Sequence, residues 1–447
     1  MSFKIPINNS PIRKNLLANL FGVGVQLMNQ IVLVPFYILF WGNELYSDWI
    51  VISALTTIFS MSDVGLNNVI QNRFAIKLSE GKKKECESLL TNNYILVAIT
   101  LLFTLLICFA FVLLFDISDL LNLHLLSRKD ASLVLAILIV KVFLGMLSNV
   151  EDSIYRATHV ASISIYMNQI GNFLVAIITL MCIISKLSVI LLSVLICLPY
   201  LFLTIIKYFH SKKYFIYYFR FKTADWQLFK EVLMPSLSFM SFPLGNMVVL
   251  QGYTLVVNSF FGAESVVLYN TTRTLCNFVK TLLNTLQYSV WPEYSIAYGN
   301  KDYHLMRHLH RKVINVTLTV SLIASIGILI FGPLIFKIWT HGAVEYNYHL
   351  MLTYISAILM ESLWVSSSVT MMATNHHTKV GILYLCATLV AITIAIIMLL
   401  LIENCSLAMI TITLVIMHLV LATYVIRAGL KFTDDSIAFS KFFRIWK

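Results

Sequence analysis

The chain has 447 residues, of which 59% are hydrophobic and only 12% are charged. Soluble domains carry about 25% charged residues, so this chain has too few polar groups to cover the core of a water-soluble enzyme of its length. Its net charge of +11 fits a nucleic acid, a membrane surface or an anionic substrate as partner, and the positions of the charges decide between the three.

Twelve apolar runs, each about 18 residues or longer, follow one another along the chain. Those in the first half are 16–40, 49–70, 94–115, 131–155, 162–184 and 187–206. Those in the second half are 232–257, 266–291, 313–336, 350–372, 380–401 and 408–426. Runs of this length cross a bilayer as α-helices, so the pattern predicts an all-α polytopic membrane protein with about twelve transmembrane helices.

Most of the 32 Lys and Arg residues fall on one set of alternating loops, which includes both ends of the chain. The opposite loops contain only Arg128, Lys129, Lys186 and Lys337. By the positive-inside rule, this bias predicts a multi-pass protein with both termini in the cytoplasm. The surplus is spread over all the inner loops instead of forming one patch, so we expect no nucleic-acid partner.

The longest hydrophilic break divides the chain into two halves. We expect an N-terminal six-helix bundle over 1–206, a basic cytoplasmic linker over 207–231, a C-terminal six-helix bundle over 232–426 and a basic cytoplasmic tail over 427–447. The motif F-x-G-x-E occurs at 40–44 and again at 260–264, after the first span of each half. These two spans cross in the same direction, so the repeat predicts bundles related by a pseudo-two-fold axis along the membrane normal.

Motifs for catalysis and nucleotide binding are missing. The chain contains no G-x-x-x-x-G-K-[ST], no G-x-G-x-x-G after a strand and no H-E-x-x-H. The outer loops between the predicted spans are short, which leaves a membrane glycosyl polymerase without its usual catalytic loop. We therefore expect a protein that is not an enzyme, with no catalytic residues, no cofactor and no metal site.

Five ionisable side chains fall inside the predicted spans, where such groups are costly and usually functional. They are Asp63, Lys141, Arg273, Lys280 and Glu361. The three basic residues are candidates for binding an anionic substrate in a cationic cavity, and the two carboxylates are candidates for coupling to protons or sodium. The alternative is structural: Arg273 reaches the membrane surface, and Lys280 pairs with Asp63 or Glu361.

The first span of each half also carries amides and a proline. The amides are Asn19, Gln26 and Gln30 in the first half, and Asn246 and Gln251 in the second. Membrane-embedded amides either contact sugar hydroxyls or hold helices together. Pro35 and Pro243 are candidate hinges in the same two spans. Most tryptophans fall at span ends, whereas Trp364 lies in the middle of a span.

Three stretches carry a resemblance to a known family. Residues 63–75 read D-V-G-L-N-N followed by N-R-F-A, residues 261–270 read F-G-A-E-S-V-V-L-Y-N, and residues 290–303 begin V-W-P-E-Y-S and end K-D-Y. Together they resemble the polysaccharide transporter (O-antigen flippase) family within the multidrug/oligosaccharidyl-lipid/polysaccharide exporter superfamily.

That resemblance implies an alternating-access flippase in the bacterial inner membrane, driven by protons or sodium. The cargo would be an oligosaccharide on undecaprenyl diphosphate, moved from the cytoplasmic to the periplasmic leaflet, with a polysaccharide polymerase and a chain-length regulator as further partners. The alternative within the superfamily is a multidrug/cation antiporter, which would favour an acidic cavity. A membrane glycosyl polymerase is the third alternative.

Overall fold

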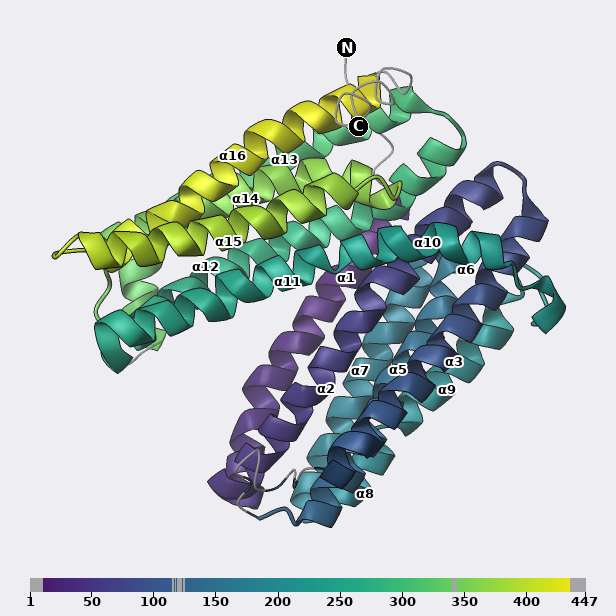
Figure 1. Cartoon of the computed structure of the whole chain (residues 1–447), viewed down its shortest axis with the longest axis horizontal. Helices are drawn as coiled ribbons and strands as arrows, with labels where there is room; N and C mark the ends of the chain where they lie inside the picture. Colours follow the sequence, from purple (N-terminus) through teal and green to yellow (C-terminus); the bar gives the residue numbers. More distant parts are fainter. Residues whose placement is uncertain are drawn as a thin grey trace. The chain divides into compact units, whose positions relative to one another are not determined.

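The computed structural model describes residues 11–434 except 115, 117, 119–122, 124 and 340–343, and for some residues within helices it describes the backbone alone. All regular elements in this part of the chain are helical (Figure 1). The chain forms two compact units, Met1–Ser236 and Leu237–Lys447.

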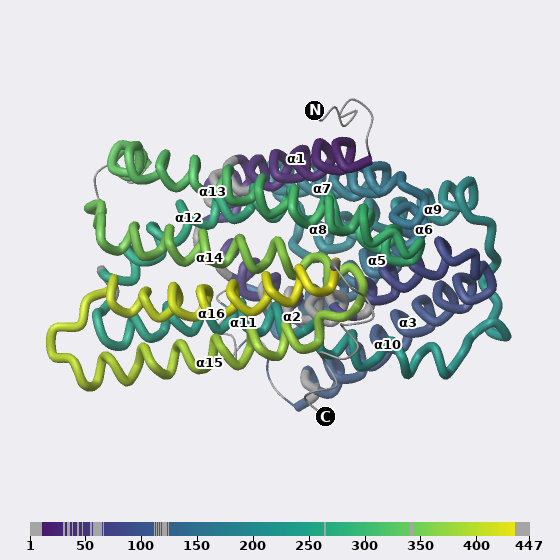
Figure 2. Tube along the Cα trace, turned by 90° about the horizontal axis from the view of Figure 1, so that it is seen from above, coloured from purple at the N-terminus to yellow at the C-terminus, as the bar shows by residue number. Residues whose placement is uncertain are grey.

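The N-terminal unit consists of long helices joined by short turns. Its elements are α1 (Pro11–Met28), the π-helical turn η1 (Asn29–Leu33), α2 (Val34–Ser79), α3 (Lys83–Leu114), α5 (Arg128–Val150), α6 (Asp152–Ala157), α7 (Ala161–Ile184), α8 (Val189–Leu195), α9 (Leu198–Ser211), the 3₁₀ turn η2 (Phe221–Thr223) and α10 (Trp226–Phe239), which runs across the boundary. Within this unit α2 packs against α3, α5 and α6, and α1 lies along α7 (Figure 2).

The C-terminal unit is built around one buried helix. Its elements are α11 (Ser241–Met247), the π-helical turn η3 (Val248–Gly252), α12 (Tyr253–Gly299), α13 (Tyr303–Trp339), α14 (Tyr348–Ala373), α15 (Thr378–Leu401) and α16 (Leu407–Asp434). Helix α14 contacts α12, α13 and α16, and Figures 1 and 2 both show α13, α14 and α16 side by side. Small residues permit this packing, since a Cβ on Gly429 of α16 would lie 2.4 Å from Ser367 Oγ of α14.

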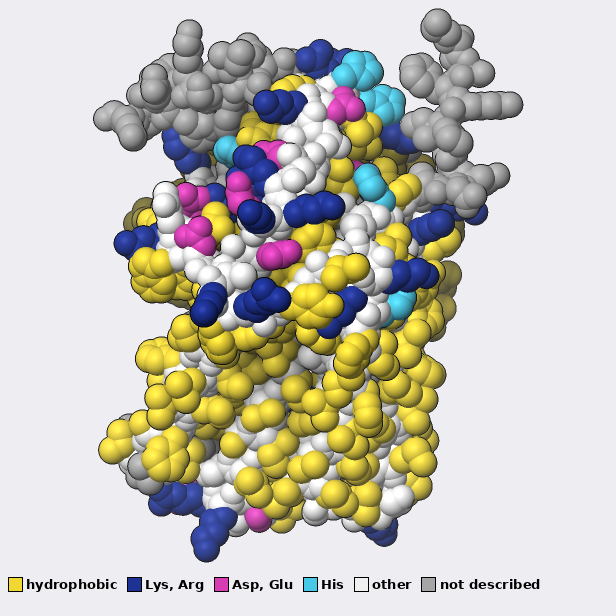
Figure 3. Space-filling model, turned by 90° about the vertical axis from the view of Figure 1, so that its right-hand side faces the viewer, with side chains coloured by type: hydrophobic (Ala, Val, Ile, Leu, Met, Phe, Trp, Pro, Cys, Tyr) yellow, Lys and Arg dark blue, Asp and Glu magenta, His cyan; other side chains and the backbone are white. Residues whose placement is uncertain are grey.

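All twelve predicted spans are helical in the described chain, which confirms the all-α, polytopic fold class. Nine of the helices described are long and apolar enough to cross a membrane. Several helices extend beyond the predicted spans: α3 and α13 begin about ten residues earlier than hydropathy indicates, because their first turns are polar and basic. Charged side chains gather at one end of the face drawn in Figure 3, and hydrophobic side chains cover most of the remainder.

Two glycines interrupt the longest helices. Gly42 has φ 74° and ψ 173° inside α2, and Gly262 has φ 80° and ψ 179° inside α12. Only glycine adopts this region without strain. These are the glycines of the repeated F-x-G-x-E motif, so the motif marks the sharp turn between the first and second span of each half.

The first span of each half contains a π-helical turn, η1 in one and η3 in the other. Pro35 occupies the first turn of α2 directly after η1. Pro243 lies in α11, and because it has no N–H it cannot bond to the carbonyl of Phe239, where α10 ends. The predicted hinge prolines thus lie outside the irregular turns, Pro35 two residues after η1 and Pro243 five residues before η3.

Candidate functional site

An ion pair joins two helices in the C-terminal unit. Lys280 Nζ on α12 lies 2.7 Å from Glu361 Oε1 on α14, and the side chains are 26% and 12% exposed. Lys280 also donates to Asn246 Oδ1 on α11 at 3.4 Å. The structure therefore brings together three predicted site residues from three helices. It pairs Lys280 with Glu361, which was one of the two structural alternatives for this lysine.

A buried histidine and two aromatic residues surround this pair. Trp364 Nε1, one turn after Glu361, donates to His418 Nδ1 on α16 at 3.1 Å. That bond leaves Nε2 to carry the proton of a neutral imidazole. His418 lies close enough to Glu361 and Lys280 for its protonated form to interact with both charges. The ring of Tyr384 lies 5.1 Å from that of Trp364, so aromatic side chains pack beside the helical turn that follows Glu361.

Arg273 supports the irregular turn of the same unit. Its Nη1 donates to the carbonyl of Leu250 in η3 at 2.6 Å and to Thr254 Oγ1 at 2.9 Å. Its guanidinium also lies over the ring of Tyr269, 5.8 Å from the ring centre. A π-helical turn disturbs the regular backbone hydrogen bonds of a helix. In η3, Arg273 donates a charge-assisted hydrogen bond to the Leu250 carbonyl at this irregular position.

Arg273 and Lys280 contact the same neighbouring segment. Arg273 reaches η3 and the start of α12, and Lys280 reaches Asn246 just before η3. They are seven residues apart, which corresponds to two turns and about 10 Å along a helix. Both side chains therefore contact the first span of this unit.

Lys141 lies in the N-terminal unit and is half-buried on α5. Its Nζ lies over the ring of Tyr200 on α9, 5.6 Å from the ring centre. Tyr200 donates to Asn172 Oδ1 at 2.9 Å, and Asn172 donates to Gln169 Oε1 at 3.2 Å. A Cβ on Gly22 of α1 would lie 2.6 Å from Gln169, so this polar row reaches the first span.

The remaining predicted residues are distributed unevenly. Asn19 is half-buried, while Gln26 and Gln251 are exposed. The side chains of Asp63, Gln30 and Pro35 lie outside the described part of the structure.

Sequence reasoning missed a buried polar cluster in the N-terminal unit. Lys207 on α9 is fully buried, with Nζ 2.6 Å from Asp152 Oδ1 and 2.8 Å from Asn168 Oδ1. Next to it, the buried Glu151 accepts from Ser211 at 2.5 Å and from Tyr94 and Tyr217. The sequence signal was the adjacent acidic pair near the end of the fourth span, opposite a lysine that ends the sixth. His418 was also missed, since nothing in the sequence links it to Trp364, its hydrogen-bond donor.

The segment after α9 is hydrogen-bonded to α3 of the N-terminal unit. Thr91 and Asn92 of α3 bond to Thr223 and to the Asp225 backbone at 2.9 and 2.8 Å. Burial, together with the Glu151 carboxylate, raises the pKa of Tyr217, so this phenol remains a hydrogen-bond donor.

Two residues of the 63–75 motif, which lies on α2, contact α10. A Cβ on Gly65 would lie 2.2 Å from the Ser236 carbonyl oxygen. Glu231, five residues before Ser236 on α10, forms an ion pair with Arg73 of α2. Gly65 and Arg73 thus have a packing role.

No family model matches the chain, and no curated protein matches it significantly. Solved structures match over nearly its whole length. An outward-facing multidrug resistance MATE family transporter of the MOP superfamily is 14% identical over 99% of each chain, with a TM-score of 0.77. A MATE protein in a bent conformation is 15% identical over 97% of each chain, also with a TM-score of 0.77.

A third match is a MOP superfamily transporter from Pyrococcus furiosus, 16% identical over 96% of this chain and 97% of that one, with a TM-score of 0.76. The binding pocket of that protein is described as having a reverse polarity that suggests a different function. The chain is therefore a multi-pass membrane protein with the fold of MATE transporters of the MOP superfamily.

Proposed function

We propose that this protein is an ion-coupled transporter, and that the Lys280–Glu361 pair is its coupling site. The observation that carries the proposal is a carboxylate and an ammonium 2.7 Å apart inside an apolar bundle. Ionisable groups in such a place are expensive and are retained mainly for function. The fold shared with MATE transporters supports the same class of activity.

The pair offers a simple coupling step. A proton or a sodium ion that neutralises Glu361 removes the partner of Lys280, and an uncompensated ammonium in this environment is strongly disfavoured. Lys280 then gains by strengthening its long hydrogen bond to Asn246 or by binding an anionic group of the cargo. Because Asn246 lies directly before η3, the ionic state of Glu361 is transmitted to the irregular part of the first span.

Two cargo classes are candidates. The first is a small organic molecule exchanged for the ion, as in a multidrug antiporter. The fold comparisons favour it, since one matching structure is a multidrug resistance transporter. The aromatic side chains of Trp364 and Tyr384 near the ion pair are suited to planar organic groups.

The second is an oligosaccharide on undecaprenyl diphosphate, flipped from the cytoplasmic to the periplasmic leaflet of a bacterial inner membrane. One observation favours it: within the described residues, neither Arg273 nor Lys141 has a carboxylate at ion-pairing distance. Such cations suit a diphosphate. With this cargo, a polysaccharide polymerase and a chain-length regulator would act next.

Transport in proteoliposomes tests the coupling site. We expect an imposed pH or sodium gradient to drive uptake of a fluorescent organic cation by the wild type but not by Glu361→Gln. Glu403→Gln, which changes an exposed carboxylate, is the matched control. Equal gradient-driven uptake by Glu361→Gln and the wild type would disprove the coupling role.

The location of lipid-linked oligosaccharide in depleted cells tests the cargo. A membrane-impermeant sugar probe is applied to intact cells and to inverted vesicles. Accumulation on the cytoplasmic face that re-expression reverses supports flipping. The absence of accumulation, combined with dye transport in liposomes, supports the multidrug antiporter.

A further inference from the structure

Helix α16 has an outward face that changes character along its length. In its first part this face is apolar: Ile412, Ile416, Leu419 and Val420 are 41–57% exposed. In its last part the same face carries Thr423, Tyr424, Arg427 and Lys431 at helical spacing. The opposite face is buried and holds His418 of the candidate coupling site. One helix thus separates the coupling site from an amphipathic outer stripe.

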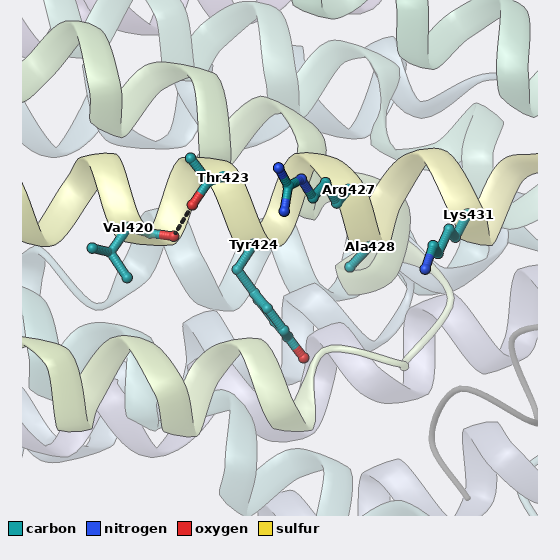
Figure 4. Close-up of a pocket in the computed structure, with 6 residues that line it drawn as sticks. All are labelled: Val420, Thr423, Tyr424, Arg427, Ala428 and Lys431. Carbon is teal, nitrogen blue, oxygen red and sulfur yellow. Dashed lines mark hydrogen bonds between the residues drawn. The ribbon is translucent and has the colours of Figure 1, made fainter. Parts of the chain in front are cut away.

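The polar part of this stripe borders a pocket of about 400 Å³. The pocket is lined by Val420, Thr423, Tyr424, Arg427, Ala428 and Lys431. Figure 4 shows these side chains along α16, with Tyr424 and Lys431 extending to one side of the helix and Arg427 lying across it. The two cationic groups therefore flank the pocket, and Val420 connects it to the apolar stripe.

We propose that this face of α16 binds one anionic phospholipid of the surrounding bilayer. Its phosphate lies between Arg427 and Lys431, the Tyr424 hydroxyl is at the level of the headgroup, and an acyl chain runs along Val420 and Ile416. Arg and Lys are the side chains that bind phosphate, and Tyr is enriched at the membrane interface.

The geometry favours a lipid over a free anion. Arg427 and Lys431 are four residues apart, which is about 6 Å along a helix, and Ile412 to Val420 adds about 12 Å of apolar surface. A phosphate alone would occupy the basic end and leave the apolar stripe unexplained. A phospholipid matches both parts in the order in which they occur. The positive-inside rule predicts that this end of α16 lies on the cytoplasmic side, where anionic lipids attract basic residues.

Lipid binding by the full-length protein tests the proposal. The purified protein is titrated with phosphatidylglycerol and, separately, with phosphatidylcholine, and bound lipid is counted by native mass spectrometry. The double variant Arg427→Gln/Lys431→Gln removes both charges, and Arg427→Lys/Lys431→Arg keeps them. Lys337→Gln, an exposed charge at the far end of α13, is the matched control.

We expect one phosphatidylglycerol to bind the wild type more tightly than phosphatidylcholine. Each basic group near an anionic surface contributes about 1 kcal/mol, so the double Gln variant should bind it roughly thirtyfold more weakly. The charge-preserving variant and Lys337→Gln should bind as the wild type does. An unchanged affinity in the double Gln variant would overturn the proposal, as would equal binding of the two lipids.

Inorganic phosphate distinguishes the two sources of the anion. If millimolar phosphate displaces the lipid fully and protects the protein against heat to the same extent, the site is an anion site and the lipid assignment is wrong. If phosphate has no such effect while a short-chain phosphatidylglycerol does, the acyl chain contributes and the assignment holds. Because each of these experiments measures lipid or phosphate binding and not transport, their results do not depend on the proposed transport function.

Discussion

Gly42 and Gly262 adopt the same backbone conformation in the two halves of the chain, with φ/ψ of 74°/173° and 80°/179°. Each follows the first span of its half, and each is preceded by a π-helical turn, η1 or η3. The repeated motif therefore corresponds to a repeated piece of backbone, an irregular first helix followed by a glycine turn. The sequence similarity between the halves is short because only the glycine is strictly required by geometry.

Replacing Gly262 by Ala tests this requirement. A Cβ there would meet nothing within 4 Å, so any loss comes from the backbone conformation alone. We expect the substitution to lower the free energy of unfolding by about 1–3 kcal/mol, measured by thermal or denaturant unfolding in detergent. Gly327→Ala is the control, because a Cβ at that helical glycine also has open space. Equal effects of the two substitutions would contradict the argument.

A double-mutant cycle on Lys280 and Glu361 tests the ion pair. Removing one partner of a buried pair costs about 3–5 kcal/mol, and the 26% exposure of Lys280 places this pair near or below the lower end of that range. We expect Glu361→Gln and Lys280→Met each to destabilise the protein, and the double variant to recover much of that loss. Additive losses would show that the two side chains do not interact in the folded protein.

Arg273 and Thr254 both donate to the Leu250 carbonyl, at 2.6 and 2.7 Å. Either one satisfies this carbonyl when the other is removed, so Arg273→Gln and Thr254→Val should each cost only about 1 kcal/mol. The combined variant should cost more than the sum of the two, because the carbonyl then loses both side-chain donors. Unfolding free energies of the three variants check this. Strict additivity would argue against a shared acceptor.

In the Lys207–Asp152 ion pair, the lysine side chain is fully buried. Lys207→Met leaves the Asp152 carboxylate buried without its ammonium partner, and we expect a loss of about 3–5 kcal/mol. Lys207→Met/Asp152→Asn should be more stable than Lys207→Met alone. Lys213→Met, outside this cluster, serves as the control. A Lys207→Met variant as stable as the wild type would show that this cluster contributes nothing to the fold.

His376 makes stability depend on pH. It lies between α14 and α15, where burial lowers its pKa, so the folded state resists protonation. The unfolded chain takes up the proton near pH 6.5, and stability is therefore lost as the pH falls below about 6.5. We expect His376→Gln to flatten the dependence of unfolding between about pH 7.5 and pH 5. His349→Gln, at an exposed site, should leave it unchanged. Parallel curves for His376→Gln and the wild type would exclude this histidine as the cause.

Hydropathy was sufficient to place the helices, because each span must satisfy its own backbone hydrogen bonds in an apolar run. It could not locate the polar first turns of α3 and α13, which the apolar pattern does not mark. Hydropathy also did not reveal the π-helical turns; Pro35 lies two residues after η1, and Pro243 lies five residues before η3.

The candidate site was partly predictable. An ionisable residue in an apolar run stands out, so Lys280 and Glu361 could be selected, but which carboxylate pairs with Lys280 depends on how α12 and α14 pack. Lys207 was placed in a loop because it lies at the end of an apolar run beside other basic residues. Its burial results from Asp152 and Asn168, which come from distant parts of the sequence.

The attachment of α10 to α2 has a mechanical consequence. Gly65 and Arg73 hold this helix as far as Ser236, and the hydrogen-bond ladder is next interrupted around Met240, before Pro243. The long basic segment after α9 is therefore held against the first unit and is not a flexible linker. The break in regular helix nearest to these contacts is therefore the one at Met240, and a change in the direction of the chain there would leave the contacts of Gly65 and Arg73 intact.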